Sequence, residues 1–202
     1  MQVCILDYGS GNVQSVLNQL LTITDNVLIS NKEEDINTST HLILPGVGSF
    51  GASMKKIKRN IPLDILEQAV LRDKKPFLGI CVGLQVLAEK GIEHGEHMGL
   101  GWIPGTVTKL QADGLLLPHI GWNNIQIKKQ HDLVKGFKAH SDFYFLHSYA
   151  FEVKNTDNII ATTEYGVKFN AIIHKENIFG VQFHPEKSQK IGKLLLHNFL
   201  SI

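Results

Sequence analysis

The chain has 202 residues, of which 43% are hydrophobic and 19% are charged. This length and composition allow one globular domain with a sizeable core and exclude an intrinsically disordered chain. Its 20 lysines and arginines nearly balance its 19 aspartates and glutamates, so no strong field favours nucleic acid or an anionic membrane. The first residues lack the basic and apolar stretches of a secretory signal, so we expect a reducing, cytoplasmic setting without disulfides.

Short apolar runs alternate with helical patterns in the first half of the chain. The apolar runs predict buried strands at residues 3–7, 26–30, 41–45 and 77–80. Apolar residues at helical spacing predict helices at residues 12–21, 52–59, 62–73 and 82–90, and glycines predict a turn at 46–51. This alternation predicts a parallel sheet with helices on both faces.

The second half changes to strand-like segments separated by turn residues. These segments cover residues 105–110, 120–128, 143–151, 159–163, 171–174 and 179–183. We expect them to form antiparallel pairs that extend the sheet, and we expect a closing helix at 188–200. No repeat or linker divides the chain. The prediction is therefore one α/β domain over residues 1–202, with a mostly parallel central sheet, helices on both faces and an antiparallel extension in the second half.

A Gly-x-Cys-x-Gly motif covers residues 79–83, between a predicted strand and a predicted helix. It has the form of a nucleophile elbow, in which a sharp, strained turn exposes the nucleophile and glycines avoid steric overlap. The helix that follows would direct its positive end at Cys81 and favour the thiolate. Cysteines without such a context are usually buried core residues, and we interpret Cys4 in that way.

A cysteine nucleophile needs a base, and His184 is the best placed of the ten histidines. It ends an apolar strand, and Pro185 favours extended geometry at His184. Because positions i and i+2 of an extended segment point the same way, Glu186 can orient the imidazole. His-Pro-Glu alone also fits an ordinary strand exit, and the nucleophile elbow favours the catalytic interpretation. Weaker candidates that also flank strands are His41, His119, His147 and His174.

Residues 46–51 form a Gly-x-Gly-x-x-Gly pattern, which is also the pattern of dinucleotide-binding loops. We reject that function, because the pattern follows the third strand and no acidic residue ends the next strand. We expect an oxyanion loop instead. Acyl transfer needs two N–H donors, one from Val82 and one from Val47 or Gly48, while Gly46 lets the backbone approach the substrate. No metal site is predicted from the acidic and histidine residues of the later glycine-containing loop, which are Glu93, His94, Glu96 and His97.

Cys81, His184 and Glu186, together with the glycine loop, resemble the class I (triad) glutamine amidotransferases. The elbow and His-Pro-Glu are typical of the family. The Pro-Gly-Val-Gly loop, a Gly-Trp-Asn run and an opening Asp-Tyr-Gly-x-Gly-Asn are typical of one subfamily. Val82 stands where leucine is usual, which leaves the chemistry unchanged because only its backbone acts. The matching stretches span the chain, at residues 7–12, 44–51, 79–85, 118–123, 145–149 and 182–188.

The resemblance implies an enzyme that hydrolyses the side-chain amide of glutamine to glutamate and ammonia, without a cofactor. Gln85 and Glu93 would bind the amide and α-amino ends of glutamine. The backbone of His147, Ser148 and Tyr149 would hold its carboxylate end.

The resemblance also implies a partner. Ammonia would pass through a channel into a (βα)₈ cyclase subunit of histidine biosynthesis, and the glutaminase would stay nearly idle until that subunit binds. Trp122 and Lys187 are candidates for the interface, although a core tryptophan and a solvated lysine are the simpler alternatives. Two other functions stay open: a paralogous amidotransferase that supplies ammonia to another pathway, such as surface-sugar amidination, and a cysteine hydrolase that acts without a partner.

Overall fold

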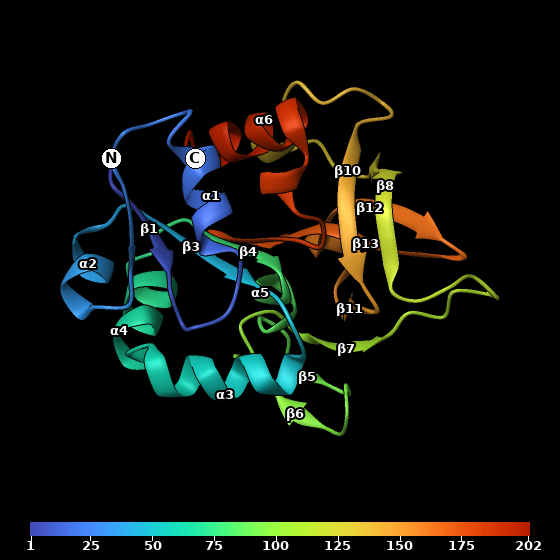
Figure 1. Ribbon diagram of the computed structural model, residues 1–202, viewed down its shortest axis with the longest axis horizontal. Coiled ribbons are helices and arrows are strands. Elements are labelled where there is room, and N and C mark those ends of the chain that lie inside the picture. Colours follow the sequence, from blue (N-terminus) through green and yellow to red (C-terminus); the bar gives the residue numbers. More distant parts are fainter.

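The computed structural model describes residues 1–202 and is built around an eight-stranded sheet (Figure 1). Five parallel strands come first, and three antiparallel strands extend the sheet at one side. The predicted α/β fold with an antiparallel extension is therefore confirmed. In spatial order the strands are β2 (Val27–Ser30), β1 (Val3–Leu6), β3 (His41–Gly46), β4 (Phe77–Cys81), β14 (Ile178–Val181), β13 (Val167–Lys175), β12 (Ile159–Tyr165) and β9 (Gln126–Ile127).

Helices cover both faces of the parallel strands, as predicted. In Figure 1, α1 (Val13–Leu20) and α6 (Gln189–Phe199) lie above the sheet. Below it lie α3 (Phe50–Asn60) and α4 (Leu63–Glu67), and α4 continues into a π-helical turn. The sequence pattern did not predict α2 (Glu33–Thr38), because Ile36 is its only buried residue and one apolar position carries no helical period.

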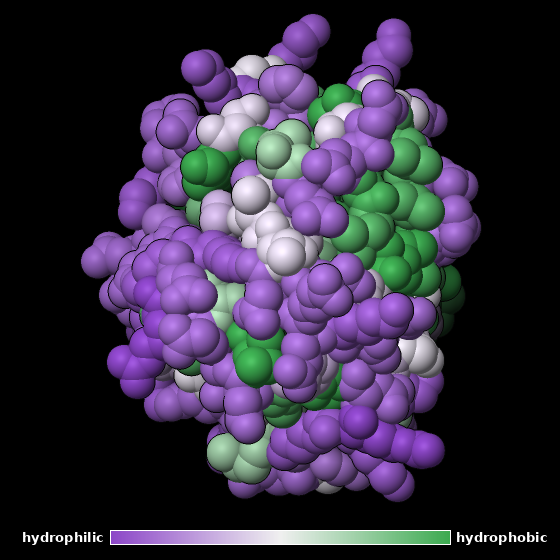
Figure 2. Space-filling view, turned by 90° about the vertical axis from the view of Figure 1, so that its left-hand side faces the viewer, coloured by the Kyte–Doolittle hydropathy of each residue, from purple (hydrophilic) through white to green (hydrophobic).

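The surface beside the edge strand β2 is mostly hydrophilic. Figure 2 shows this side of the molecule, on which hydrophobic residues gather in one area while polar and charged residues cover the rest. A hydrophilic surface beside an edge strand disfavours unwanted pairing with another chain. None of the helices has the length and apolar character needed to span a lipid bilayer.

Two segments of the second half depart from the prediction, because each divides into two strands of different sheets. The segment 120–128 becomes β8 (His119–Asn124) and β9, and only β9 joins the central sheet. The segment 143–151 becomes β10 (Asp142–His147) and β11 (Tyr149–Val153), divided at Ser148. β8 pairs with β10 in a two-stranded sheet, and β11 lies in a separate four-stranded sheet. That sheet also contains β7 (Gly105–Lys109), β5 (Lys90–Gly91) and β6 (His97–Met98).

The predicted helix 82–90 is also shorter than expected, since α5 covers only Val82–Gln85. The backbone that follows pairs with a distant segment instead of continuing the helix. Leu100 N donates to Val86 O at 2.8 Å, and Gly101 N donates to Ala88 O at 3.0 Å. Partners brought by the tertiary fold thus replace the helical hydrogen bonds at these residues.

Candidate active site

The predicted site residues meet at the carboxyl ends of three neighbouring parallel strands. β3, β4 and β14 are adjacent, and the pairing places Gly46 opposite Cys81 and Val181 opposite Ile80. His184 follows β14 by three residues and therefore reaches the same edge. Ligands of open α/β sheets bind in this position, outside the carboxyl ends of the strands.

A pocket of about 180 Å³ opens at this edge. Each segment that we predicted to form the site contributes residues to its lining, including the predicted nucleophile and base. The size suits a small substrate held close to Cys81. Its lining residues are Val47, Gly48, Cys81, Val82, Gln85, Glu93, Pro118, Leu146, His147, Ser148, Tyr149 and His184.

Cys81 occupies the strained turn that its motif predicts. Its φ of +55° lies in the left-handed region, which non-glycine residues rarely adopt outside functional sites. The flanking glycines are required by close backbone packing. A Cβ at Gly83 would overlap the carbonyl oxygen of Leu44, and a Cβ at Gly79 would overlap the carbonyl oxygen of Gly83. The elbow is therefore packed too tightly for any side chain at these two positions.

We expect Gly83→Ala to lower the free energy of unfolding by at least about 3 kcal/mol, because the added methyl group forces the elbow away from β3. Gly114→Ala is the control, since Gly114 has a φ of +84° but open space around it. That change should cost only about 1 kcal/mol of backbone strain. Denaturant unfolding of the two variants and the unaltered protein gives both values, and equal losses would contradict the packing argument.

The electrostatic surroundings of Cys81 differ from the expectation. Because α5 has only four residues, its dipole is smaller than that of the predicted helix 82–90. Side chains and backbone atoms contact the sulfur instead. Gln182 Nε2 lies 3.8 Å from Cys81 Sγ, and Cys81 Sγ lies 3.7 Å from the carbonyl oxygen of Leu146. By contrast, Cys4 is a core residue as predicted, and burial raises the pKa of its thiol to about 12.

His184 and Glu186 form a buried pair. His184 Nδ1 lies 2.8 Å from Glu186 Oε1, and both side chains are almost completely buried. His184 is extended, as expected, but the residues after it are not, because a 3₁₀ turn begins at Pro185, whose fixed φ suits the first position of such a turn. Burial by itself would lower the pKa of His184, but hydrogen bonds with Cys81 and Glu186 raise it to about 10. These contacts thus favour the imidazolium form of His184.

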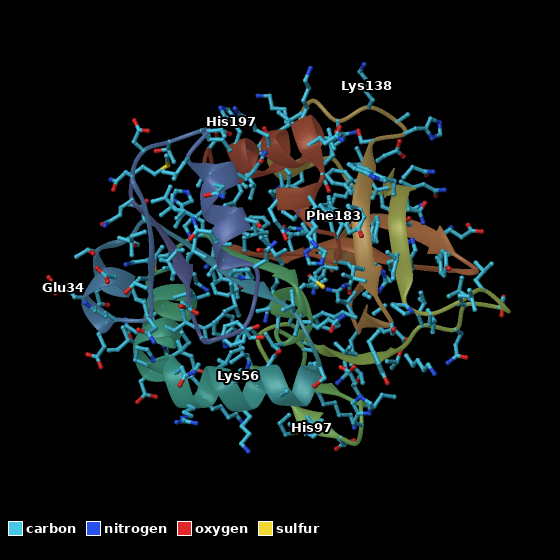
Figure 3. The ribbon with its side chains drawn as sticks, in the orientation of Figure 1. Glu34, Lys56, His97, Lys138, Phe183 and His197 are labelled. Atoms are coloured by element: carbon cyan, nitrogen blue, oxygen red, sulfur yellow. The ribbon has the colours of Figure 1, made fainter.

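Packing against β10 holds His184 in place. Phe183, which lies at the centre of the molecule in Figure 3, stacks on Phe143 with ring centroids 3.9 Å apart. His184 N donates to the carbonyl oxygen of Tyr144 at 2.8 Å. Ser188 Oγ donates to the carbonyl oxygen of His184 at 2.7 Å and accepts from Tyr144 N at 3.0 Å. A rigid frame of this kind limits the movement of the ring.

The glycine loop after β3 contributes Val47 and Gly48 to the pocket. Gly48 has a φ of +94° in open space, and the hydroxyl of Ser10 donates to the carbonyl oxygen of Val47 at 3.0 Å. Gly46 is not among the lining residues. It is buried against α5, where a Cβ would lie 2.6 Å from Gly83 N. Glycine is therefore needed at position 46 because a side chain there would prevent the loop from packing on the elbow.

Gln85 joins the pocket to β11 through its side-chain amide. Gln85 Nε2 donates to the carbonyl oxygen of Tyr149 at 2.9 Å and to Gln182 Oε1 at 3.1 Å. The same carbonyl oxygen accepts from His147 Nδ1 at 2.9 Å, and His147 Nε2 lies 3.2 Å from His119 Nδ1. Burial lowers the pKa of His147 to about 3 and that of His119 to about 4, so both rings are neutral.

Sequence reasoning did not find the contacts of Gln182 and His119. The contact of Gln182 could have been predicted, because residues two positions apart in a strand point the same way and Gln182 precedes His184 by two positions. For His119 no such signal exists, since its partner His147 belongs to a strand far along the chain.

Glu93 lies at the rim of the pocket and fixes the start of α3. Its Oε2 accepts from Phe50 N at 2.8 Å, so the carboxylate satisfies an N–H group at the end of the helix that Ser49 leaves uncapped. The loop around Glu93 is thereby tied to the end of the glycine loop 46–51, where α3 begins.

Trp122 and Lys187 lie outside the pocket. Trp122 is 50% exposed, so the alternative of a core tryptophan is wrong. Its ring meets that of Tyr144 edge-on at 6.1 Å, and Lys187 Nζ lies 5.5 Å from the centroid of the same Tyr144 ring. The three side chains form one group, in which Trp122 on β8 and Lys187 are exposed and Tyr144 on β10 is half-buried.

The chain is similar to known proteins over nearly its whole length. The sequence profile of the family Glutamine amidotransferase class-I matches residues 4–202. The imidazole glycerol phosphate synthase subunit HisH of Zymomonas mobilis is 44% identical over 206 residues, which cover 98% of this chain and 94% of that protein. Subunit HisH 2 of Pseudomonas aeruginosa is 39% identical over 201 residues, which cover 99% of each chain.

Solved structures share the fold at much lower identity. PurLQS from Thermotoga maritima matches with a TM-score of 0.73 and 17% identity, covering 99% of this chain and 97% of that one. A glutamine amidotransferase from the same organism matches with a TM-score of 0.72 and 15% identity, covering 100% and 96%. At these identities the likeness concerns the fold alone.

Proposed function

The chain belongs to the class-I glutamine amidotransferase family, and we propose that it is the glutaminase subunit of an imidazole glycerol phosphate synthase. The observation that carries the proposal is the buried contact of 2.8 Å between His184 and Glu186, next to a strained cysteine that lines the same pocket. Nucleophile, base and orienting carboxylate are thus side by side, as amide hydrolysis through a thioester requires.

In the first half of the reaction, the Cys81 thiolate attacks the side-chain carbonyl carbon of glutamine. The N–H groups of Val82 and of the oxyanion loop, at Val47 or Gly48, stabilise the oxyanion that forms. The carbon–nitrogen bond then breaks, and the His184 imidazolium gives its proton to the departing ammonia. A thioester between Cys81 and the glutamyl group is left.

In the second half, neutral His184 takes a proton from a water molecule, which attacks the thioester. The carbon–sulfur bond breaks, glutamate leaves, and the thiolate and imidazolium are restored. Glu186 keeps the Nδ1 proton of His184 in place throughout, so that Nε2 faces the reacting atoms. We assign the amide and α-amino ends of glutamine to Gln85 and Glu93, and its carboxylate end to the backbone of residues 147–149.

The ammonia acceptor is a (βα)₈ cyclase subunit that makes imidazole glycerol phosphate and aminoimidazole carboxamide ribotide in histidine biosynthesis. We assign its docking surface to the exposed side of β8, where Ile120 and Trp122 are 59% and 50% exposed, together with Lys187. Aromatic residues with exposed apolar neighbours are common at the centre of protein interfaces. We place the heterodimer in the cytoplasm, since a nucleophilic thiol needs a reducing compartment.

The proposal is tested by measuring glutamate release from the purified chain, alone and with the cyclase subunit of the same organism bound and loaded with its nucleotide. We expect very low activity for the isolated chain and a rise of about 5- to 150-fold in the complex, the usual range of coupling between sites. Equal rates with and without the partner would instead favour a cysteine hydrolase. Activation only by a cyclase from a polysaccharide gene cluster would favour a paralogous pathway.

A further inference from the structure

Gln182 is a fully buried polar residue between the central sheet and the pocket. It follows β14 directly, and its backbone N–H donates to the carbonyl oxygen of Ala171 at 2.9 Å, so its backbone is held by the sheet. A buried amide side chain is costly unless its own polar atoms are paired. Both ends of the Gln182 amide find partners, and both partners belong to the site.

The direction of the Gln182 amide is determined by a chain of hydrogen bonds. The carbonyl oxygen of Tyr149 can only accept, so the atom of Gln85 that lies 2.9 Å from it must be the donor Nε2. This nitrogen can only donate, so the atom of Gln182 that lies 3.1 Å from it must be the acceptor Oε1. The N–H group of Gln182 therefore points at Cys81 Sγ, 3.8 Å away.

We propose that Gln182 is a further catalytic residue, whose side-chain amide donates a hydrogen bond to the Cys81 thiolate and is held in that direction by Gln85. The inference rests on the proposed function, since it deepens the account of the same site. A hydrogen bond to an ionised acceptor is stronger than one between neutral groups, so the contact favours the thiolate. The carbonyl oxygen of Leu146 acts in the opposite sense, because it can accept only from the protonated thiol.

The hydrogen bond from Gln182 to Cys81 supplies part of the thiolate stabilisation that we expected from the dipole of the predicted helix 82–90. With α5 reduced to one turn, the Gln182 amide is the side-chain donor within hydrogen-bond distance of the sulfur, and His184 lines the same pocket. Both follow β14, so one strand supplies the groups that stabilise the nucleophile. Several titratable groups line the pocket or act on the triad, and they stay unchanged in the variants below: Tyr8, Glu93, His147, Tyr149, His184 and Glu186.

The test uses two variants of matched size. Gln182→Met removes both polar ends, whereas Gln182→Glu keeps an oxygen that accepts from Gln85 and replaces the donor to the sulfur by a carboxylate oxygen. The rate at which iodoacetamide modifies Cys81 is measured against pH by mass spectrometry of the peptide that contains it. We expect the midpoint of the profile to move to higher pH by about one unit in Gln182→Met, and further in Gln182→Glu because of the added negative charge.

Steady-state kinetics with the cyclase subunit bound provide a second measurement. We expect kcat to fall about tenfold in Gln182→Met and by more in Gln182→Glu, since less of the enzyme holds a thiolate. The KM for glutamine should rise in Gln182→Met, where Gln85 loses a partner, and stay close to its original value in Gln182→Glu. A purely structural role predicts neither the shift in the pH profile nor this difference in KM.

Thr163→Val is the matched control, because it removes a buried hydroxyl that donates to the carbonyl oxygen of Asn124 at 2.7 Å, away from the pocket. It should lower stability without moving the alkylation profile. Identical midpoints in the unaltered protein, Gln182→Met and Gln182→Glu would overturn the inference, and either folded variant suffices for this outcome. Because alkylation needs no glutamine, this result is distinguishable from a failure of the proposed function, which would show as no glutaminase activity in the unaltered complex.

Discussion

Replacing Cys81 with alanine is expected to lower glutamine-dependent turnover of the complex on the order of 10⁶-fold, as the loss of the nucleophile does in other triads. No second thiol can replace it, since Cys4 lies in the core strand β1 and is fully buried. The physical reason is that Cys81 is the only nucleophile in the pocket held at a strained turn, with His184 beside it. Glutamate release from the complex measures the loss.

Two controls separate loss of chemistry from loss of structure. The same complex supplied with an ammonium salt should keep its cyclase reaction, because free ammonia bypasses the glutaminase. Cys4→Ala should retain glutaminase activity while losing some stability to the cavity left in the core. Glutaminase turnover of Cys81→Ala at the original rate would exclude the proposed mechanism, and loss of the ammonium-dependent reaction would point to a misfolded subunit.

Replacing Glu186 with glutamine is expected to lower kcat by about 10³- to 10⁴-fold with little change in volume. The carboxylate accepts from His184 Nδ1 at 2.8 Å and carries the charge that balances the imidazolium. A neutral amide lacks that charge and can also turn its N–H group toward Nδ1, which selects the wrong tautomer. Glutamate release by the cyclase-bound variant measures the effect, and Glu176→Gln, at an exposed surface ion pair, is the control.

The same variant tests the pKa of His184 through stability. The folded-state pKa of about 10 lies above the ordinary value of about 6.5, so between these limits the folded protein binds more protons than the unfolded chain. The contribution of His184 is therefore fully present below about pH 6.5 and is lost as the pH rises through about 10. Denaturant unfolding across this range should show a smaller decline in Glu186→Gln than in the unaltered protein. An equal decline in the free energy of unfolding of both proteins would contradict a strong His184–Glu186 interaction.

Much of the fold was readable from local patterns. Apolar runs such as those of β1, β3 and β4 predict buried parallel strands because both faces of these strands are covered. The same holds for the elbow, since the steric demand at Gly79 and Gly83 arises within one strand–turn–helix unit. Cys81, His184 and Glu186 could be singled out because each lies in a short motif with a chemical reason for its residue types.

Contacts between distant segments could not be predicted from local sequence patterns. The helix after Cys81 stops at Gln85 because residues 86–88 find backbone partners in residues 100–103, which no local period reveals. The two strands that meet at Ser148 belong to different sheets for the same reason. The direction of the Gln182 amide depends on Gln85 and on the carbonyl oxygen of Tyr149, which only the packing of α5, β11 and β14 brings together. Residue types thus specify the chemistry of the triad, whereas long-range packing sets the hydrogen bonds that tune its nucleophile.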